Sequence, residues 1–144
     1  MAASISPDVS ATDVARERVA KLFTALPSLV AANADLMRRG RFLTCDFEIG
    51  IDSLPLSVSV VEGGIKAVAR GPFLLKPWVF SVRMPADAWL EFLAPVPKPG
   101  WHDIMALSKR GVARIEGNLQ PFMANLQYIK DVLATPRADA GATP

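Results

Sequence analysis

A region near the middle of the chain, in which apolar and polar residues alternate, most constrains what this sequence can fold into. In residues 42–51, Phe47 and Ile49 alternate with Asp46 and Glu48. Side chains of a strand point to its two faces in turn, so this spacing predicts a strand with one buried and one solvated face. The same alternation recurs in residues 55–61, 65–70 and 77–84. Four such strands joined by short links predict an antiparallel meander.

Two adjacent glycines separate the second and third of these strands. Gly63 and Gly64 can adopt the positive φ angles that a two-residue hairpin turn requires. A fifth strand is predicted for residues 112–117, between Gly111 and Asn118. The strand is short and leads at once into a segment that is apolar along one side. Its place in the fold therefore depends on what that segment covers.

The segment before the strands has helical spacing. Its apolar residues recur three and four positions apart: Val19, Leu22, Phe23, Leu26, Leu29, Val30 and Leu36. Thr12 or Asp13 can cap the start of this helical region, and Gly40 can end it. Pro27 predicts a kink or the start of a second short helix.

Three further helices are expected after the fourth strand. Pro85 opens the first at its N1 position, and the proline-rich residues 95–99 must end it. A second short helix should end at Gly111. Asn118 should cap the last helix. One face of that helix is apolar at Leu119, Phe122, Leu126, Ile129 and Leu133. The predicted fold class is α+β.

The length of 144 residues suits one domain. Residues 1–11 and 135–144 contain too little apolar material to order themselves, so both are predicted to be flexible tails around a domain of residues 12–134. The single cysteine, Cys45, fits a reducing compartment. We see no secretory signal and no membrane-spanning stretch, which predicts a cytoplasmic protein. A net charge of only +2 argues against a nucleic-acid partner.

Few residues suggest catalysis. His102 is the only histidine and lies next to Asp103, but sequence neighbours on a helix do not face each other. Cys45 falls on the apolar side of its strand, which favours a buried, inert thiol. No metal-ligand spacing and no phosphate-loop, dinucleotide or nucleophile-elbow motif occurs. The sequence therefore predicts no catalytic residues, no metal, no cofactor and no enzymatic activity, with a hydrolase or acyltransferase acting through His102 as the alternative.

Several charged groups have two interpretations. Asp46 and Glu48 could act as a paired carboxylate, but on a solvated strand face we expect ordinary surface charges. Two basic clusters could meet anionic lipid head groups during a transient membrane contact. They are Arg38, Arg39 and Arg41, and Lys109, Arg110 and Arg114. The other interpretation is that these cations favour helix dipoles and solubility.

The large apolar side chains of the second half of the chain form the candidate site. Hydrophobic residues make up 51% of the sequence, which is high for a protein of this size. The residues predicted to line a ligand cavity are Phe80, Trp89, Phe92, Leu93, Ile104, Met105, Phe122, Met123, Leu126 and Ile129. Plain core packing is the alternative interpretation of the same residues.

The order of elements resembles the sterol carrier protein 2 family over roughly residues 22–133. Three segments carry the resemblance: "SVSVVEGGIKAVA", "VFSVRMPADAWLEFLAP" and "RGVARIEGNLQPFMANLQYIKDVL". The last contains a glycine, a short strand, a glycine followed by asparagine and a closing apolar helix, as members of that family commonly do. Gly111, Ile115, Gly117 and Asn118 match this ending.

The resemblance implies a five-stranded, mainly antiparallel sheet covered on one face by helices. These would enclose a tunnel for a fatty acyl chain, acyl-CoA, sterol or phospholipid, closed by the C-terminal helix. It implies a non-enzymatic lipid carrier; an alternative is an accessory subunit that presents an isoprenoid or acyl substrate to a partner enzyme. The stiff segment "APVPKPGWHD" departs from the short glycine-containing link that is common in the family. The tunnel entrance is therefore expected to differ here.

Overall fold

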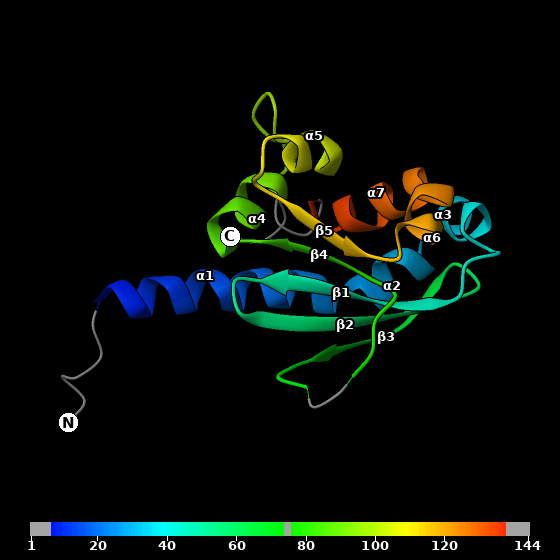
Figure 1. Cartoon of the computed structure of the whole chain (residues 1–144), viewed down its shortest axis with the longest axis horizontal. Coiled ribbons are helices and arrows are strands. Elements are labelled where there is room, and N and C mark those ends of the chain that lie inside the picture. The colour runs from blue at the N-terminus through cyan, green and yellow to red at the C-terminus, as the bar shows by residue number, and fades with distance from the viewer. Residues whose placement is uncertain (1–6, 74–75, 138–144) are drawn as a thin grey trace.

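The computed structural model describes residues 7–73 and 76–137 (Figure 1). Five strands form one mixed sheet with the order β3-β2-β1-β4-β5. They are β1 Cys45–Ile51, β2 Leu54–Val61, β3 Gly64–Arg70, β4 Phe80–Met84 and β5 Arg114–Gly117. The neighbours are antiparallel except for β1 and β4, which run parallel. The predicted fold class, an α+β protein with a five-stranded and mainly antiparallel sheet, is confirmed.

The predicted meander is wrong, because β4 does not follow β3 in the sheet. Ile49 of β1 pairs with Val82 of β4, on the opposite side of β1 from β2. The connection after β3 must therefore pass over β2 and β1. Figure 1 shows its last residues, 76–79, in front of these strands, with α1 and α2 behind them. We expected a short link between neighbouring strands, but nine residues, 71–79, separate β3 from β4 in the sequence.

The hairpin between β2 and β3 turns one residue earlier than predicted. Its central residues are Glu62, with φ of 50°, and Gly63, with φ of 82°. Gly64 is the first residue of β3. Two positive φ angles in succession match the type I′ turn that suits the twist of a hairpin. The amide of Glu62 donates to the hydroxyl of Thr44 at 3.0 Å, which ties the turn to the start of β1.

Three helices precede the sheet: α1 Pro7–Thr24, α2 Leu26–Ala31 and α3 Ala34–Arg39. Thr12 and Asp13 lie inside α1, so the predicted cap at either residue is wrong. Pro27 falls in the first turn of α2, which confirms that it begins a second helix. Gly40 is the C-cap of α3, as predicted. The ring of Tyr128 lies where a side chain at Gly40 would project, so only glycine fits there.

Four helices follow β4: α4 Ala86–Phe92, α5 Ile104–Lys109, α6 Leu119–Ala124 and α7 Leu126–Ala134. The predicted last helix is therefore two helices, with a break at Asn125. Asn118 is the N-cap of α6, as predicted, and its side-chain oxygen accepts the amide of Gln120 at 3.2 Å. None of the described helices is long and apolar enough to cross a membrane.

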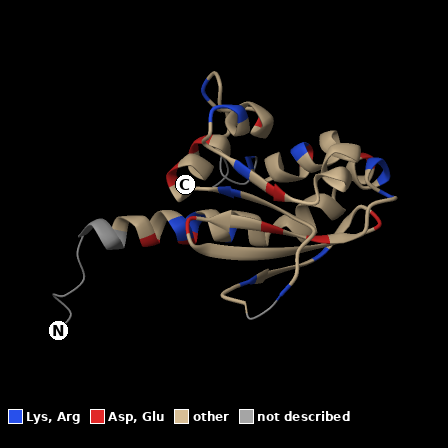
Figure 2. Cartoon of the chain, in the orientation of Figure 1, with Lys and Arg blue, Asp and Glu red and all other residues tan. Residues whose placement is uncertain are grey.

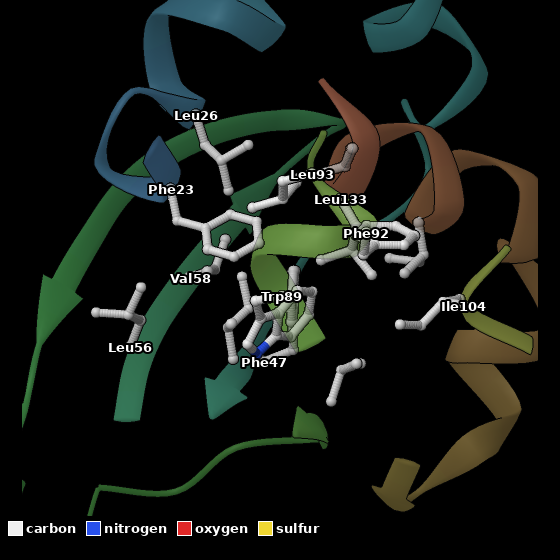
Figure 3. Packing of buried hydrophobic residues seen from close by; sticks show 14 of the residues in the cluster. Phe23, Leu26, Phe47, Leu56, Val58, Trp89, Phe92, Leu93, Ile104 and Leu133 are labelled. Carbon is white, nitrogen blue, oxygen red and sulfur yellow. The ribbon is translucent and has the colours of Figure 1, made fainter. Parts of the chain in front are cut away.

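The core lies between the helices and one face of the sheet, which we call the inner face. Phe47, Ile49, Val58, Phe80 and Val82 point to this face and are fully buried. Figure 3 shows Phe47, Leu56 and Val58 from the sheet meeting side chains of α1, α4 and the C-terminal helices. The alternation in the sequence therefore identified the buried face of each of these strands.

The opposite, outer face is not simply solvated. Glu48 is 6% exposed and forms an ion pair with Arg83, so its interpretation as an ordinary surface charge is wrong. Ser57 and Ser81, which lie beside Glu48 on the neighbouring strands, are buried as well. Part of the connection after β3 covers this face, since its residues 77–79 border a hollow together with Asp46.

Candidate functional site

The structure brings the predicted cavity residues together at the inner face. Seven of them are at most 1% exposed: Phe80, Trp89, Phe92, Leu93, Ile104, Phe122 and Ile129. Met105 and Leu126 are partly buried against the same cluster. Met123 is 52% exposed and lies on the surface of α6. These residues come from β4, from α4 and its C-cap, and from α5 to α7, so segments that are far apart in the sequence converge on one interior region.

A row of aromatic rings runs from the sheet to α6. Phe47 of β1 and Phe80 of β4 are stacked, with centroids 4.9 Å apart and an interplanar angle of 6°. Phe122 of α6 meets Phe80 edge to face at 5.2 Å and 72°. Edge-to-face and offset-stacked pairs are favourable aromatic geometries. Phe122 is thus the side chain through which α6 closes over the sheet.

A second aromatic group fixes α4 against α1. Trp89 meets Phe23 edge to face at 5.1 Å and Phe92 at 5.8 Å. The indole N–H of Trp89 donates to the carbonyl of Gly50 on β1 at 2.9 Å. A buried tryptophan needs such a partner for its N–H. Trp89 therefore links α4 to both α1 and β1.

Phe23 and Phe47 belong to this interior but were absent from the predicted set. Both are fully buried and each contacts a predicted residue, Trp89 and Phe80 respectively. The helical spacing of Phe23 and the strand alternation at Phe47 had already placed them on core-facing sides. Both lie in the first half of the chain, whereas the predicted set was drawn from the second half.

The helix α6 is a thin cover. It has six residues, and Leu119 on its outer side is 39% exposed. The prediction that Leu119 lies on the buried face of the closing helix is wrong. The N-cap at Asn118 and the break at Asn125 set α6 apart from α7, so the apolar spacing does not continue unbroken through both.

Among the described residues, most of the large apolar side chains that are exposed lie at one end of the sheet. Phe42 is 85% exposed just before β1, and Val61 is 43% exposed at the end of β2. The pairing of Cys45 with Val60 places both at the same end of the sheet. Leu119 and Met123 follow β5, whose last residue pairs with the first residue of β4 at that end. We call Phe42, Val61, Leu119 and Met123 the apolar end.

Burial changes the acidity of two groups near this end. Burial raises the pKa of the Cys45 thiol to about 11, and the nearby Asp46 carboxylate adds to the effect. Burial also raises the pKa of Tyr128 to about 12, with a smaller contribution from Cys45. Since the thiolate is the reactive form of cysteine, a raised pKa is consistent with the inert thiol that the sequence predicts.

His102 and Asp103 do not form an acid–base pair within the described residues. The side chain of Asp103 accepts the amide of Met105 at the start of α5 and pairs with Lys130 at 3.2 Å. His102 is exposed, and its backbone carbonyl accepts a hydrogen bond from Arg137. Arg137, in the segment predicted to be a tail, also stacks over the ring of Phe92, with its guanidinium 4.5 Å from the ring centroid.

Residues 7–73 and 76–137 contain no group of three or more His, Cys, Asp or Glu side chains that could hold a metal ion.

Three hollows lie on the surface of the described residues. The largest of the three has a volume of about 360 Å³ and lies at the ends of β1 and β4 that are opposite the apolar end. A second lies between α1 and the start of α4, and a third lies beside Trp78. None of these three is lined by a residue of the predicted cavity set.

Solved structures share this arrangement of sheet and helices. A crystal structure of sterol carrier protein 2 superimposes with a TM-score of 0.66 at 9% sequence identity, over 81% of this chain and 94% of that one. This chain has the sterol carrier protein 2 fold. A protein of Thermus thermophilus that is described as possibly a sterol carrier protein matches with a TM-score of 0.57 at 11% identity, over 81% of this chain and 86% of that chain.

A third structure with this fold is the UbiJ-SCP2 ubiquinone synthesis protein. It matches with a TM-score of 0.53 at 15% identity, over 80% of this chain and 94% of that chain. No protein-family model and no curated protein matches the sequence. The fold predicted from the sequence resemblance is therefore confirmed by structural similarity.

Proposed function

We propose that this protein binds and carries an apolar ligand between the inner face of its sheet and its C-terminal helices, without catalysing a reaction. The ligand classes are a fatty acyl chain, an acyl-CoA, a sterol or a phospholipid. One observation carries the proposal. In a chain with the sterol carrier protein 2 fold, nine of the ten predicted lining residues lie in or against one interior cluster.

The ligand would enter by displacing α6. Phe122 packs against Phe80 beneath this helix, so room for a chain requires these side chains to move. Burying about sixteen carbons at ~0.8 kcal/mol per methylene gives ~13 kcal/mol. That is comparable with the roughly 4 to 15 kcal/mol that association costs. Reversible binding of the kind a carrier needs is therefore physically reasonable.

The apolar end would contact a membrane surface while the ligand is exchanged. Phe42 projects from a well-fixed loop, in which the amide of Leu43 donates to the carbonyl of Gly40 at 2.8 Å. The guanidinium of Arg41 lies 4.4 Å from the Phe42 ring centroid. An exposed aromatic ring beside a cation suits the boundary between acyl chains and head groups. Replacing Phe42 with serine should then reduce cosedimentation with phospholipid vesicles.

The second candidate function is an accessory subunit that presents an isoprenoid or acyl substrate to a separate enzyme. Structural similarity to the UbiJ-SCP2 ubiquinone synthesis protein favours it. The interior would serve either role, because both need an apolar binding space. Copurification with an enzyme that loses turnover when this chain is deleted would distinguish the accessory role from independent carriage.

The ligand site can be tested by displacement of a fluorescent fatty acid. Leu126 is partly buried against the interior cluster. Leu126→Phe should fill part of the space and raise the Kd for the fatty acid several-fold, while urea unfolding shows that the variant remains folded. Val14→Phe is the matched control, because Val14 is 64% exposed on α1. Equal affinities for both variants and the wild type would place the ligand elsewhere.

A further inference from the structure

Two arginines lie opposite each other on the outer face of the sheet. Arg83 of β4 pairs in register with Arg114 of the edge strand β5. Like charges directly opposite on neighbouring strands are destabilising. The ion pair with Glu48 balances Arg83. Within the described parts of the chain, no carboxylate forms an ion pair with Arg114.

Arg83 is held in position yet remains accessible. A side chain at Gly50 would place its Cβ 2.6 Å from Cγ of Arg83, so the arginine stem lies across this glycine of β1. The nearly buried Glu48 then fixes the guanidinium, while the Arg83 side chain keeps 35% of its surface exposed. A group that is already ordered loses little entropy when it binds a ligand.

Both arginines open into the hollow of about 360 Å³, a volume within the usual range of small-ligand sites. The hollow is lined by Asp52, Arg83, Met84, Pro85, Gly111, Val112 and Arg114. Its one carboxylate, on Asp52, accepts the amide of Ala86 at 3.2 Å. Lys109 and Arg110 directly precede Gly111 in the chain, and Figure 2 shows basic residues gathered at the end of α5 and on β4 and β5.

We propose that this hollow binds a phosphoryl group between Arg83 and Arg114. A guanidinium fork binds phosphate through two parallel hydrogen bonds. A phosphoryl group offers three acceptor oxygens, so two arginines can bind it at once. A carboxylate has only two oxygens, which a single fork can occupy. The source is either a phospholipid head group or a free phosphorylated small molecule, and the site does not depend on the carriage of an apolar ligand inside the protein.

Titration calorimetry in phosphate-free buffer tests the site with three probes. They are pyrophosphate, dihexanoyl phosphatidic acid and dihexanoyl phosphatidylcholine, each below its micelle concentration. We expect pyrophosphate and phosphatidic acid to bind and phosphatidylcholine to bind least. Tighter binding of phosphatidic acid than of pyrophosphate would identify a lipid head group as the source. Equal or weaker binding would identify a free phosphorylated molecule.

Arg114→Gln should raise the Kd for pyrophosphate about tenfold or more, the scale of one charge-assisted hydrogen bond. Arg18→Gln is the matched control, since it removes the same charge from an exposed position on α1. Its Kd should change less than twofold. No binding of any probe, or equal weakening by both substitutions, would overturn the proposal.

Gly50→Ala tests the role of Arg83 without changing any charge. The added Cβ would push the Arg83 stem aside, so we expect several-fold weaker pyrophosphate binding in a protein that still unfolds cooperatively in urea. Unchanged binding by this folded variant would remove Arg83 from the site.

Discussion

Tyr128 ties the last helix to the turn between β2 and β3. Its hydroxyl donates to the carbonyl of Gly63 at 2.6 Å in a buried position, and its ring packs over Gly40. Tyr128→Phe removes only the hydroxyl and leaves the Gly63 carbonyl without this partner. We expect the free energy of unfolding to fall by about 1 to 3 kcal/mol. Urea unfolding checks this, and a change below about 0.3 kcal/mol would show that water replaces the bond.

Cys45 should make the fold sensitive to alkali. Its pKa is about 11 in the folded protein, against an ordinary value of 9.0, so the folded state favours the neutral thiol. That contribution is complete below pH 9 and is lost as the pH rises from 9 to 11. Cys45→Ala should therefore lose less stability over this interval than the wild type.

The effect of Cys45 is best measured by urea unfolding at several pH values between 8 and 11. Tyr128 adds its own loss between pH 10 and 12, because its pKa is raised to about 12. Parallel stability curves for Cys45→Ala and the wild type between pH 9 and 10 would contradict the assignment. In the native protein at pH 8, alkylation of the thiol by iodoacetamide should be slow.

At the scale of single elements, the hairpin turn is not optimal. Glu62 holds a positive φ of 50°, which costs energy for a side chain that is not glycine or asparagine. Asparagine followed by glycine is the preferred pair for a type I′ turn. Glu62→Asn should therefore raise the free energy of unfolding by about 0.5 to 1 kcal/mol. Thermal unfolding tests this, and a lower Tm would mean that Glu62 has a partner that offsets the strain.

One face of the helix α7 is buried in the core, and its burial is needed for stability. Ile129 is fully buried, whereas Leu126 is only partly buried, so a charge at Ile129 is the sharper test of this interface. Ile129→Glu should cost several kcal/mol and unfold most of the protein at 25 °C. Met123→Glu, on the exposed side of α6, should change stability by less than about 0.5 kcal/mol. Similar losses for both variants would mean that α6 is buried in solution.

The sequence could predict which side of each element is buried better than where elements begin or pair. Alternation placed Ile49 and Val58 on the inner face because the two faces of a strand differ in polarity. Helical spacing likewise predicted that Ile129 is buried, which is confirmed. The break at Asn125 was missed, since apolar spacing across it still fits a single helix. The turn at Glu62 was missed because Gly63 and Gly64 are equally free to adopt positive φ.

At the scale of the whole molecule, strand order was the feature that local patterns could not supply. The parallel pairing of β1 with β4 arises from a connection that crosses the sheet, and nothing in the alternation of either strand records it. For the same reason, local patterns could not show that Glu48 forms an ion pair with Arg83. Only the pairing brings them together, with Gly50 leaving room for the arginine stem. The candidate interior could be predicted because the order of helices and strands brings its residues together. The resemblance to the sterol carrier protein 2 family rests on that same order.

Native mass spectrometry of the protein as purified from cells, followed by extraction and identification of what it holds, tests the central claim most directly. The proposed function predicts a copurifying apolar molecule at near-stoichiometric level, released when the protein unfolds. Leu126→Phe should retain less of it, and Val14→Phe should retain as much as the wild type. Neither result would bear on the proposed phosphoryl site at Arg83 and Arg114. A protein that is empty after purification and that also fails to bind added fluorescent fatty acid would contradict the carrier function.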